Sequence, residues 1–84
     1  MTTTKLSTTI NDDTFTIIIK DYSKIGLSVY FEVRFEEFEN PIITGRKEVN
    51  VWIAKLENLT REGYYVEDVV RDIIHQYNKL SVRS

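Results

Sequence analysis

Strict alternation of apolar and polar side chains over Leu27–Phe35 is the feature of this 84-residue chain that most constrains its fold. The apolar residues at every second position are Leu27, Val29, Phe31, Val33 and Phe35. Successive side chains of a β-strand point to opposite faces of the sheet, so this pattern predicts a strand with one buried face and one wet face. Phe38 has the wrong parity to continue the pattern, which predicts a bulge or the strand end near Glu37.

Two further segments have the character of strands. Thr14–Lys20 is rich in β-branched and aromatic residues, and Lys47–Ile53 alternates again, with Val49, Val51 and Ile53 on one face and Asn50 and Trp52 on the other. The Thr-rich residues 1–13 form either a tail or a short edge strand, and residues 14–56 make up the sheet. For the apolar residues of Thr14–Lys20 to join the buried face of Leu27–Phe35, the numbers of paired residues must sum to an even value.

The last part of the chain predicts a helix over residues 66–80. Its apolar residues step by three and four positions and form one stripe, which consists of Val66, Val69, Val70, Ile73, Ile74, Tyr77 and Leu80. Residues 54–62 fit two descriptions. We favour a short helix or turn that ends at Gly63; the alternative is a strand that runs on to Leu56 and is followed by a loop.

These elements predict a single α+β domain over residues 1–84. A meandering antiparallel sheet of three to four strands would be covered on one face by the long C-terminal helix. The chain has no cysteine, so the apolar core must hold the fold without disulfides or cysteine-bound metal. No apolar run approaches the roughly 18 to 20 residues of a membrane span, and no secretory signal opens the chain. We therefore expect a cytoplasmic protein that does not interact with membranes.

Residue types that carry catalysis are scarce. His75 is the only histidine, and we interpret it as a helix-surface residue because no nucleophile stands near it in the sequence. Glu32 and Glu36 would lie about 13 Å apart along a strand, beyond the roughly 5 to 9.5 Å of a glycosidase pair. Phosphate-binding, dinucleotide-binding, zinc-binding and calcium-binding motifs are absent from the sequence. We expect no enzyme activity, cofactor, metal ion or small-molecule substrate.

Charge gives a further constraint. The chain has a formal net charge of −2. Four glutamates lie close to Arg34 in the sequence: Glu32, Glu36, Glu37 and Glu39. These glutamates predict a solvated strand face or an acidic docking edge for a basic partner. Nucleic-acid binding is disfavoured, because it needs a positively charged groove along the phosphates.

Residues 46–80 resemble the ribbon-helix-helix family of dimeric DNA-binding repressors. The resemblance rests on the alternating strand Lys47–Ile53, a possible helix up to Gly63, and the helical stretch Val66–Ile74. It implies that the strand pairs across a dimer and that Glu48, Asn50 and Trp52 face the DNA major groove. Glu48 would be repelled by phosphate, and no basic residue stands among the three.

The whole chain resembles in type the small phage-encoded inhibitors such as anti-CRISPR proteins. Many of these are short, acidic, cysteine-free domains with a sheet and a helix. The resemblance implies a protein that acts by covering a surface of a host protein.

The sequence thus predicts a non-catalytic protein-binding module. Its partner would be a host protein or a second copy of the chain, bound through the sheet face opposite the helix. The candidate partner-binding residues are Tyr30, Glu32, Arg34, Glu36 and Trp52. Alternatively, Tyr30 and Trp52 fill a second small core. The alternative function is that of a dimeric DNA-binding transcriptional regulator of the ribbon-helix-helix kind.

Overall fold

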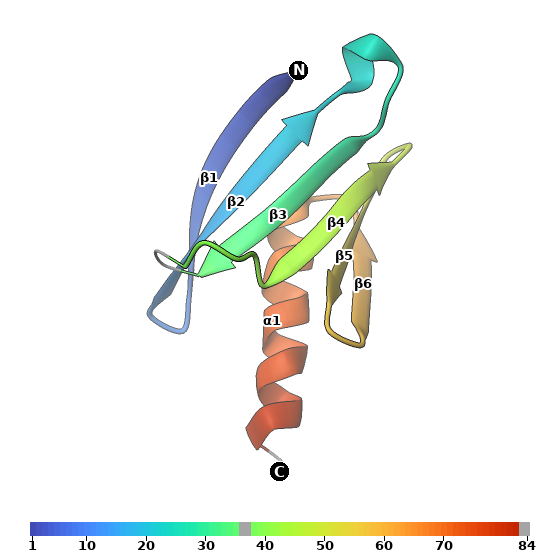
Figure 1. Cartoon of the computed structure of the whole chain (residues 1–84). Helices are drawn as coiled ribbons and strands as arrows, with labels where there is room; N and C mark the ends of the chain where they lie inside the picture. Colours follow the sequence, from blue (N-terminus) through green and yellow to red (C-terminus); the bar gives the residue numbers. More distant parts are fainter. Residues whose placement is uncertain (36–37, 83–84) are drawn as a thin grey trace.

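The computed structural model describes the backbone of residues 1–35 and 38–82 and the side chains of residues 1–35 and 38–80. The elements are β1 (Thr2–Ile10), β2 (Asp13–Asp21), a 3-10 turn η1 (Ser23–Ile25), β3 (Val29–Phe35), β4 (Ile43–Glu48), β5 (Val51–Leu56), β6 (Leu59–Gly63) and α1 (Val66–Val82). In this described part of the chain, six strands form one antiparallel sheet in their sequence order (Figure 1). The predicted α+β class is confirmed, but the sheet has six strands where three to four were predicted.

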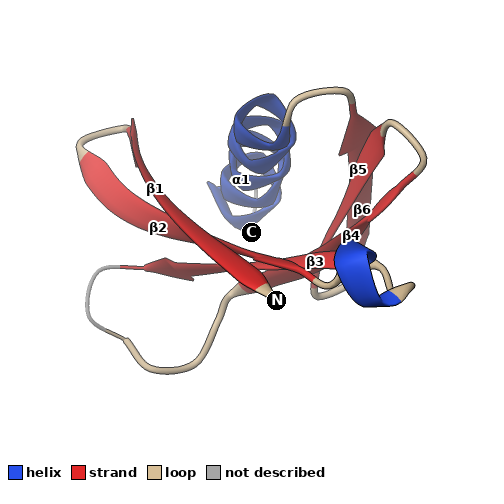
Figure 2. Ribbon diagram, turned by 90° about the horizontal axis from the view of Figure 1, so that it is seen from above, coloured by secondary structure: helices blue, strands red, loops and turns tan. Residues whose placement is uncertain are grey.

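The sheet and the helix form two layers. Figure 2 shows the sheet curving around α1, which lies in its concave side. The predicted even-sum register is confirmed, because Phe15 pairs with Phe35 and Ile17 pairs with Val33. The predicted helix is also confirmed, and its apolar stripe faces the sheet. The core contains Ile10, Phe15, Ile17, Phe31, Val33, Ile43, Ala54, Leu56, Val66, Val69, Val70, Ile73 and Ile74.

The Thr-rich N-terminus is a full edge strand. A two-residue turn at Asn11 and Asp12, with φ of 52° and 70°, lets β1 pair with β2 from the Thr2–Asp21 pair to the Ile10–Asp13 pair. Asn and Asp tolerate this left-handed backbone conformation better than most residues do, and the type I′ turn of a hairpin requires it. Of the two predicted forms of residues 1–13, the edge strand is the one observed, and it is long.

The predicted single strand over Lys47–Ile53 is wrong. A second two-residue turn, at Val49 and Asn50, divides it into β4 and β5, so that Glu48 pairs with Val51 and Lys47 pairs with Trp52. Because the chain reverses at this turn, the odd-numbered residues of β4 share a face with the even-numbered residues of β5. Trp52 therefore points to the α1 side of the sheet, and Val51 and Ile53 point away from it.

Residues 54–62 also belong to a hairpin. The favoured short helix is wrong, since β5 continues to Leu56, turns at Glu57 and Asn58, and returns as β6. The alternative strand extension to Leu56 is confirmed, but the residues after it form a strand instead of a loop. The ribbon-helix-helix resemblance implies a helix at these positions, where the structure has β6. Gly63 lies in β6 against α1, where an added Cβ would come 2.9 Å from Cγ2 of Val69.

Candidate functional site

The face of the sheet that points away from α1 has no helix packed on it among the described elements (Figure 2). We call it the open face. It carries the odd-numbered residues of β1 and β5 and the even-numbered residues of β2, β3, β4 and β6. Residues 38–42, which lead into β4, pass on this side at one end of the sheet. The strands themselves therefore present a broad surface to solvent.

The open face is positively charged, although the chain as a whole has a net charge of −2. Its described strands carry five cations against three carboxylates, a balance of +2. The cations are Lys5, Lys20, Arg34, Arg46 and Lys55, and the carboxylates are Glu32, Glu48 and Glu62. The negative charge of the molecule consequently lies elsewhere, including the outer side of α1 with Glu67, Asp68 and Asp72.

Glu32 lies between two of these cations. Its Oε1 is 3.4 Å from Nζ of Lys20 and 3.2 Å from Nη2 of Arg34, and its side chain is only 16% exposed. Glu32 is thus paired with two cations of the open face. Of the other glutamates in the predicted acidic docking edge, Glu36 and Glu37 lie outside the described residues, and Glu39 is exposed in the loop after β3.

A buried isoleucine, Ile18, lies beneath charged side chains of the open face. Ile18 is 8% exposed but lies on the open face, where it pairs with Lys5 on one side and Glu32 on the other. The aliphatic stems of long charged side chains cover apolar surface in this way while their charged ends remain in water. The charged groups of the open face are therefore held over a small apolar patch.

A shallow hollow of about 380 Å³ lies on the open face across β3 to β6. Tyr30, 48% exposed, stands at one side of it, with its ring 6.2 Å from the ring of Tyr22 in a T-shaped contact. Arg46 and Lys55 supply two cations, and Ile53 supplies apolar surface. Nε of Arg46 is paired with Oε1 of Glu48 at 2.8 Å, so an acidic ligand group would bind its other guanidinium nitrogens or displace Glu48. None of the described residues that line the hollow carries a carboxylate. The hollow therefore suits a ligand group that combines negative charge with some apolar surface.

Trp52 is separated from the other predicted site residues. Its ring contacts Phe31 at a centroid distance of 5.8 Å, and Nζ of Lys47 lies 5.1 Å from the ring centroid. The ring packs against the core on the α1 side. Tyr30, Glu32 and Arg34 do share the open face, as their alternation along one strand predicted.

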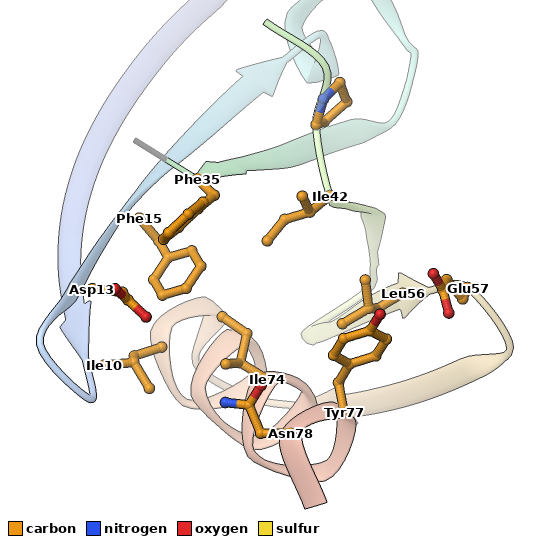
Figure 3. A pocket seen from close by; sticks show the side chains of 11 residues that line it. Ile10, Asp13, Phe15, Phe35, Ile42, Leu56, Glu57, Ile74, Tyr77 and Asn78 are labelled. Atoms are coloured by element: carbon orange, nitrogen blue, oxygen red, sulfur yellow. The ribbon is translucent and has the colours of Figure 1, made fainter. Parts of the chain in front are cut away.

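Sequence reasoning missed a second concave region, between α1 and the end of the sheet. This cavity of about 540 Å³ is largely apolar, and Asp13 and Glu57 lie on opposite sides of it (Figure 3). Its apolar lining comes from Ile10, Phe15, Phe35, Ile42, Leu56, Ile74 and Tyr77. Because these residues come from segments far apart in the sequence, no local pattern could have marked the cavity.

His75 is exposed on α1, as predicted for a helix-surface residue. Within residues 1–35 and 38–82, no group of three or more histidine, aspartate or glutamate side chains is placed to hold a metal ion. In the same residues, α1 is too short and too polar to cross a membrane.

Comparison with known proteins finds no matching family model, no matching curated protein and no matching solved structure.

Proposed function

We propose that this chain is a non-catalytic module that binds another protein through the open face. The observation that carries the proposal is the hollow with Tyr30, Arg46 and Lys55, set in a positively charged face of an otherwise acidic chain. The partner would present an acidic surface. Binding would act by occupation, because a sheet face seated on a partner excludes other molecules from that surface.

The residue types in and around the hollow fit this task. Tyrosine and arginine are enriched among residues that dominate binding energy, since they combine large contact area with directed hydrogen bonds. Hydrogen bonds from Arg46 and Lys55 to carboxylates would be charge-assisted and therefore stronger than neutral ones. The ion pairs that Glu32 makes with Lys20 and Arg34 hold neighbouring side chains in place before binding, which lowers the entropic cost of forming an interface.

A protein partner fits the open face better than a nucleic acid does. Glu32, Glu48 and Glu62 stand among the cations and would repel a continuous phosphate backbone. Tyr30 and the neighbouring Tyr22 form a single edge-to-face pair beside the hollow, whereas single-strand binding uses several aromatic faces in succession. Carboxylates on a folded partner can instead be spaced to match separate cations.

The inhibitor hypothesis belongs with this proposal. A small phage-type inhibitor that blocks a host protein needs a stable scaffold and one complementary surface. The sheet would supply the scaffold, and the open face would supply the surface.

The test is affinity capture from host cell lysate, followed by binding measurements on the purified partner. Arg46→Glu and Tyr30→Ala should each weaken binding at least tenfold, and binding should weaken as salt concentration rises. Arg71→Glu is the matched control, because Arg71 is a similarly exposed arginine that pairs with Asp68 on α1, away from the open face. Equal losses in Arg46→Glu and Arg71→Glu would rule out the open face as the interface. Salt-dependent binding of a DNA duplex in place of a protein would support the repressor alternative.

A further inference from the structure

The two edges of the sheet differ in how they are protected. β6 is five residues long and packs against α1, where Nε of Arg61 lies 3.6 Å from Oδ2 of Asp72. β1 is nine residues long, pairs with β2 without a break in register, and contains no proline. Natural sheets usually guard an edge with a short strand, a proline, a bulge or several charges. Lys5 is the only charged residue of β1, so this edge has little of the usual protection against pairing with another strand.

The hydrogen-bonding groups that β1 leaves free can be identified from its turn. The two-residue turn at Asn11 and Asp12 makes Ile10 and Asp13 the closing pair of the hairpin, which exchanges hydrogen bonds. Hydrogen-bonded and non-hydrogen-bonded pairs alternate along an antiparallel ladder. The even-numbered residues of β1 thus bond to β2, and the N–H and C=O groups of Thr3, Lys5, Ser7 and Thr9 point outward.

We propose that this edge pairs with β1 of a second copy, in an antiparallel register centred on Leu6. Leu6 is the midpoint of the strand, so this register pairs β1 along its whole length and satisfies all of the outward-pointing backbone groups. It also keeps the two copies of α1 on the same side of the joined sheet, because the numbers of paired residues sum to an even value.

The side chains favour the same register. Threonines pair with threonines, since Thr3 lies opposite Thr9 of the second copy and Thr4 lies opposite Thr8. Lys5 lies opposite Ser7 of the second copy, so no like charges face each other. A register centred on Lys5 would instead oppose two lysines, which is unfavourable in cross-strand pairs.

The joined sheet would carry two open faces side by side in one continuous surface. This consequence does not depend on the proposed partner, because it follows from the edge alone. It would give any ligand of the open face two sites that are related by a two-fold axis.

The experiment is sedimentation of the purified full chain over a range of concentrations. Ser7→Glu places a carboxylate opposite each Lys5 and should lower the dimer dissociation constant by about 2- to 30-fold, the effect expected of two cross-strand charge pairs. Ser7→Lys should raise the constant by a similar factor. The double variant Lys5→Glu with Ser7→Lys, which reverses the charges across the pair, should restore dimerisation.

Thr14→Glu and Thr14→Lys are matched controls, since Thr14 is exposed on the same face one strand away from the edge. Ser7→Pro is a further test, because the Ser7 N–H points outward and its loss leaves the β1–β2 ladder intact. This variant should be monomeric with an unchanged circular dichroism spectrum. A wild-type chain that stays monomeric at all soluble concentrations would overturn the proposal. Ser7 variants that shift the constant only as much as the Thr14 controls would overturn it too.

Discussion

The ring of Phe31 on β3 covers the backbone of Gly45, its cross-strand neighbour on β4. A methyl group at Gly45 would overlap that ring and the carbonyl oxygen of Ile53. The same ring is in edge contact with Trp52 on β5. A glycine in a strand interior often marks such a close approach of another group to the backbone. Gly45 thus allows an aromatic pair to pack where three strands meet.

Gly45→Ala should lower the free energy of unfolding by about 1–3 kcal/mol, because the added methyl group overpacks a filled site. Urea denaturation monitored by Trp52 fluorescence measures this change. Thr44→Ala, at the next residue but on the exposed open face, should change the free energy of unfolding by no more than about 0.5 kcal/mol. Equal losses in the two variants would contradict the packing described here.

Trp52→Ala should destabilise the fold far more than Tyr30→Ala. Trp52 packs on the core, so its truncation should cost about 2–4 kcal/mol of unfolding free energy. Tyr30 is half exposed on the open face, and its truncation should cost less than about 1 kcal/mol. Thermal denaturation followed by circular dichroism compares both variants with the wild type. A stable Trp52→Ala variant would mean that Trp52 does not pack on the core.

Val49→Gly should stabilise the protein. Val49 has a φ of 56° in the turn between β4 and β5 and is 91% exposed, so its side chain strains the backbone and contributes little packing. Glycine adopts this conformation without the clash, and the net gain after its higher chain entropy should be about 0.5–1 kcal/mol. Chemical denaturation measures the gain. Val51→Gly, two residues later in β5, should instead be destabilising, and a gain there as well would point to a cause other than the turn.

The pKa of Asp21 should depend on Ser23. The carboxylate of Asp21 accepts hydrogen bonds from the Ser23 hydroxyl and from the Ser23 N–H at 2.8 Å, which hold the pKa of Asp21 below its ordinary value. Ser23→Ala removes the hydroxyl, so the Asp21 pKa should rise toward that ordinary value. A carboxyl carbon titration by NMR measures it, with Ser28→Ala as the control.

The sign of the pH effect follows from this depressed pKa. The hydrogen-bonded carboxylate stabilises the fold above the unfolded-state pKa of Asp21, and this contribution is lost as pH falls through the folded-state pKa. Ser23→Ala should therefore flatten the loss of stability at acidic pH. A variant with an unchanged Asp21 pKa would show that the hydroxyl does not act on the carboxylate.

The elements with a long regular pattern could be predicted from the sequence. The alternation through Val29–Phe35 and the apolar stripe of α1 each bury one side, so the periodicity itself determines the face. For the same reason the sequence alone places Tyr30, Glu32 and Arg34 on one face of a strand.

The short hairpins could not be predicted, because their turns lack the usual residues. The β4–β5 and β5–β6 turns have Val49 and Glu57 at positive φ, where glycine, asparagine or aspartate is more common. An asparagine follows in each turn, at positions 50 and 58, and is the only local signal of chain reversal. Because the β4–β5 turn was not predicted, Trp52 was assigned to the wrong face of the sheet. Because the β5–β6 turn was not predicted, β6 was not predicted either. β6 supplies Thr60 to the hollow on the open face.

Each of the described strands pairs only with its neighbours in the sequence, and this has a consequence for how the protein folds. Every contact between paired strands can form within one hairpin. The chain entropy lost in closing each loop is therefore small in the early steps of folding. We expect folding to be fast for a chain rich in β-structure. The hairpin of β5 and β6 leads directly into α1, which packs on both strands, and is the natural place for folding to begin. β1 lies at the far end of this order, so in the monomer it can open while the other strands stay paired, and its amide protons should then exchange with solvent before those of the rest of the sheet.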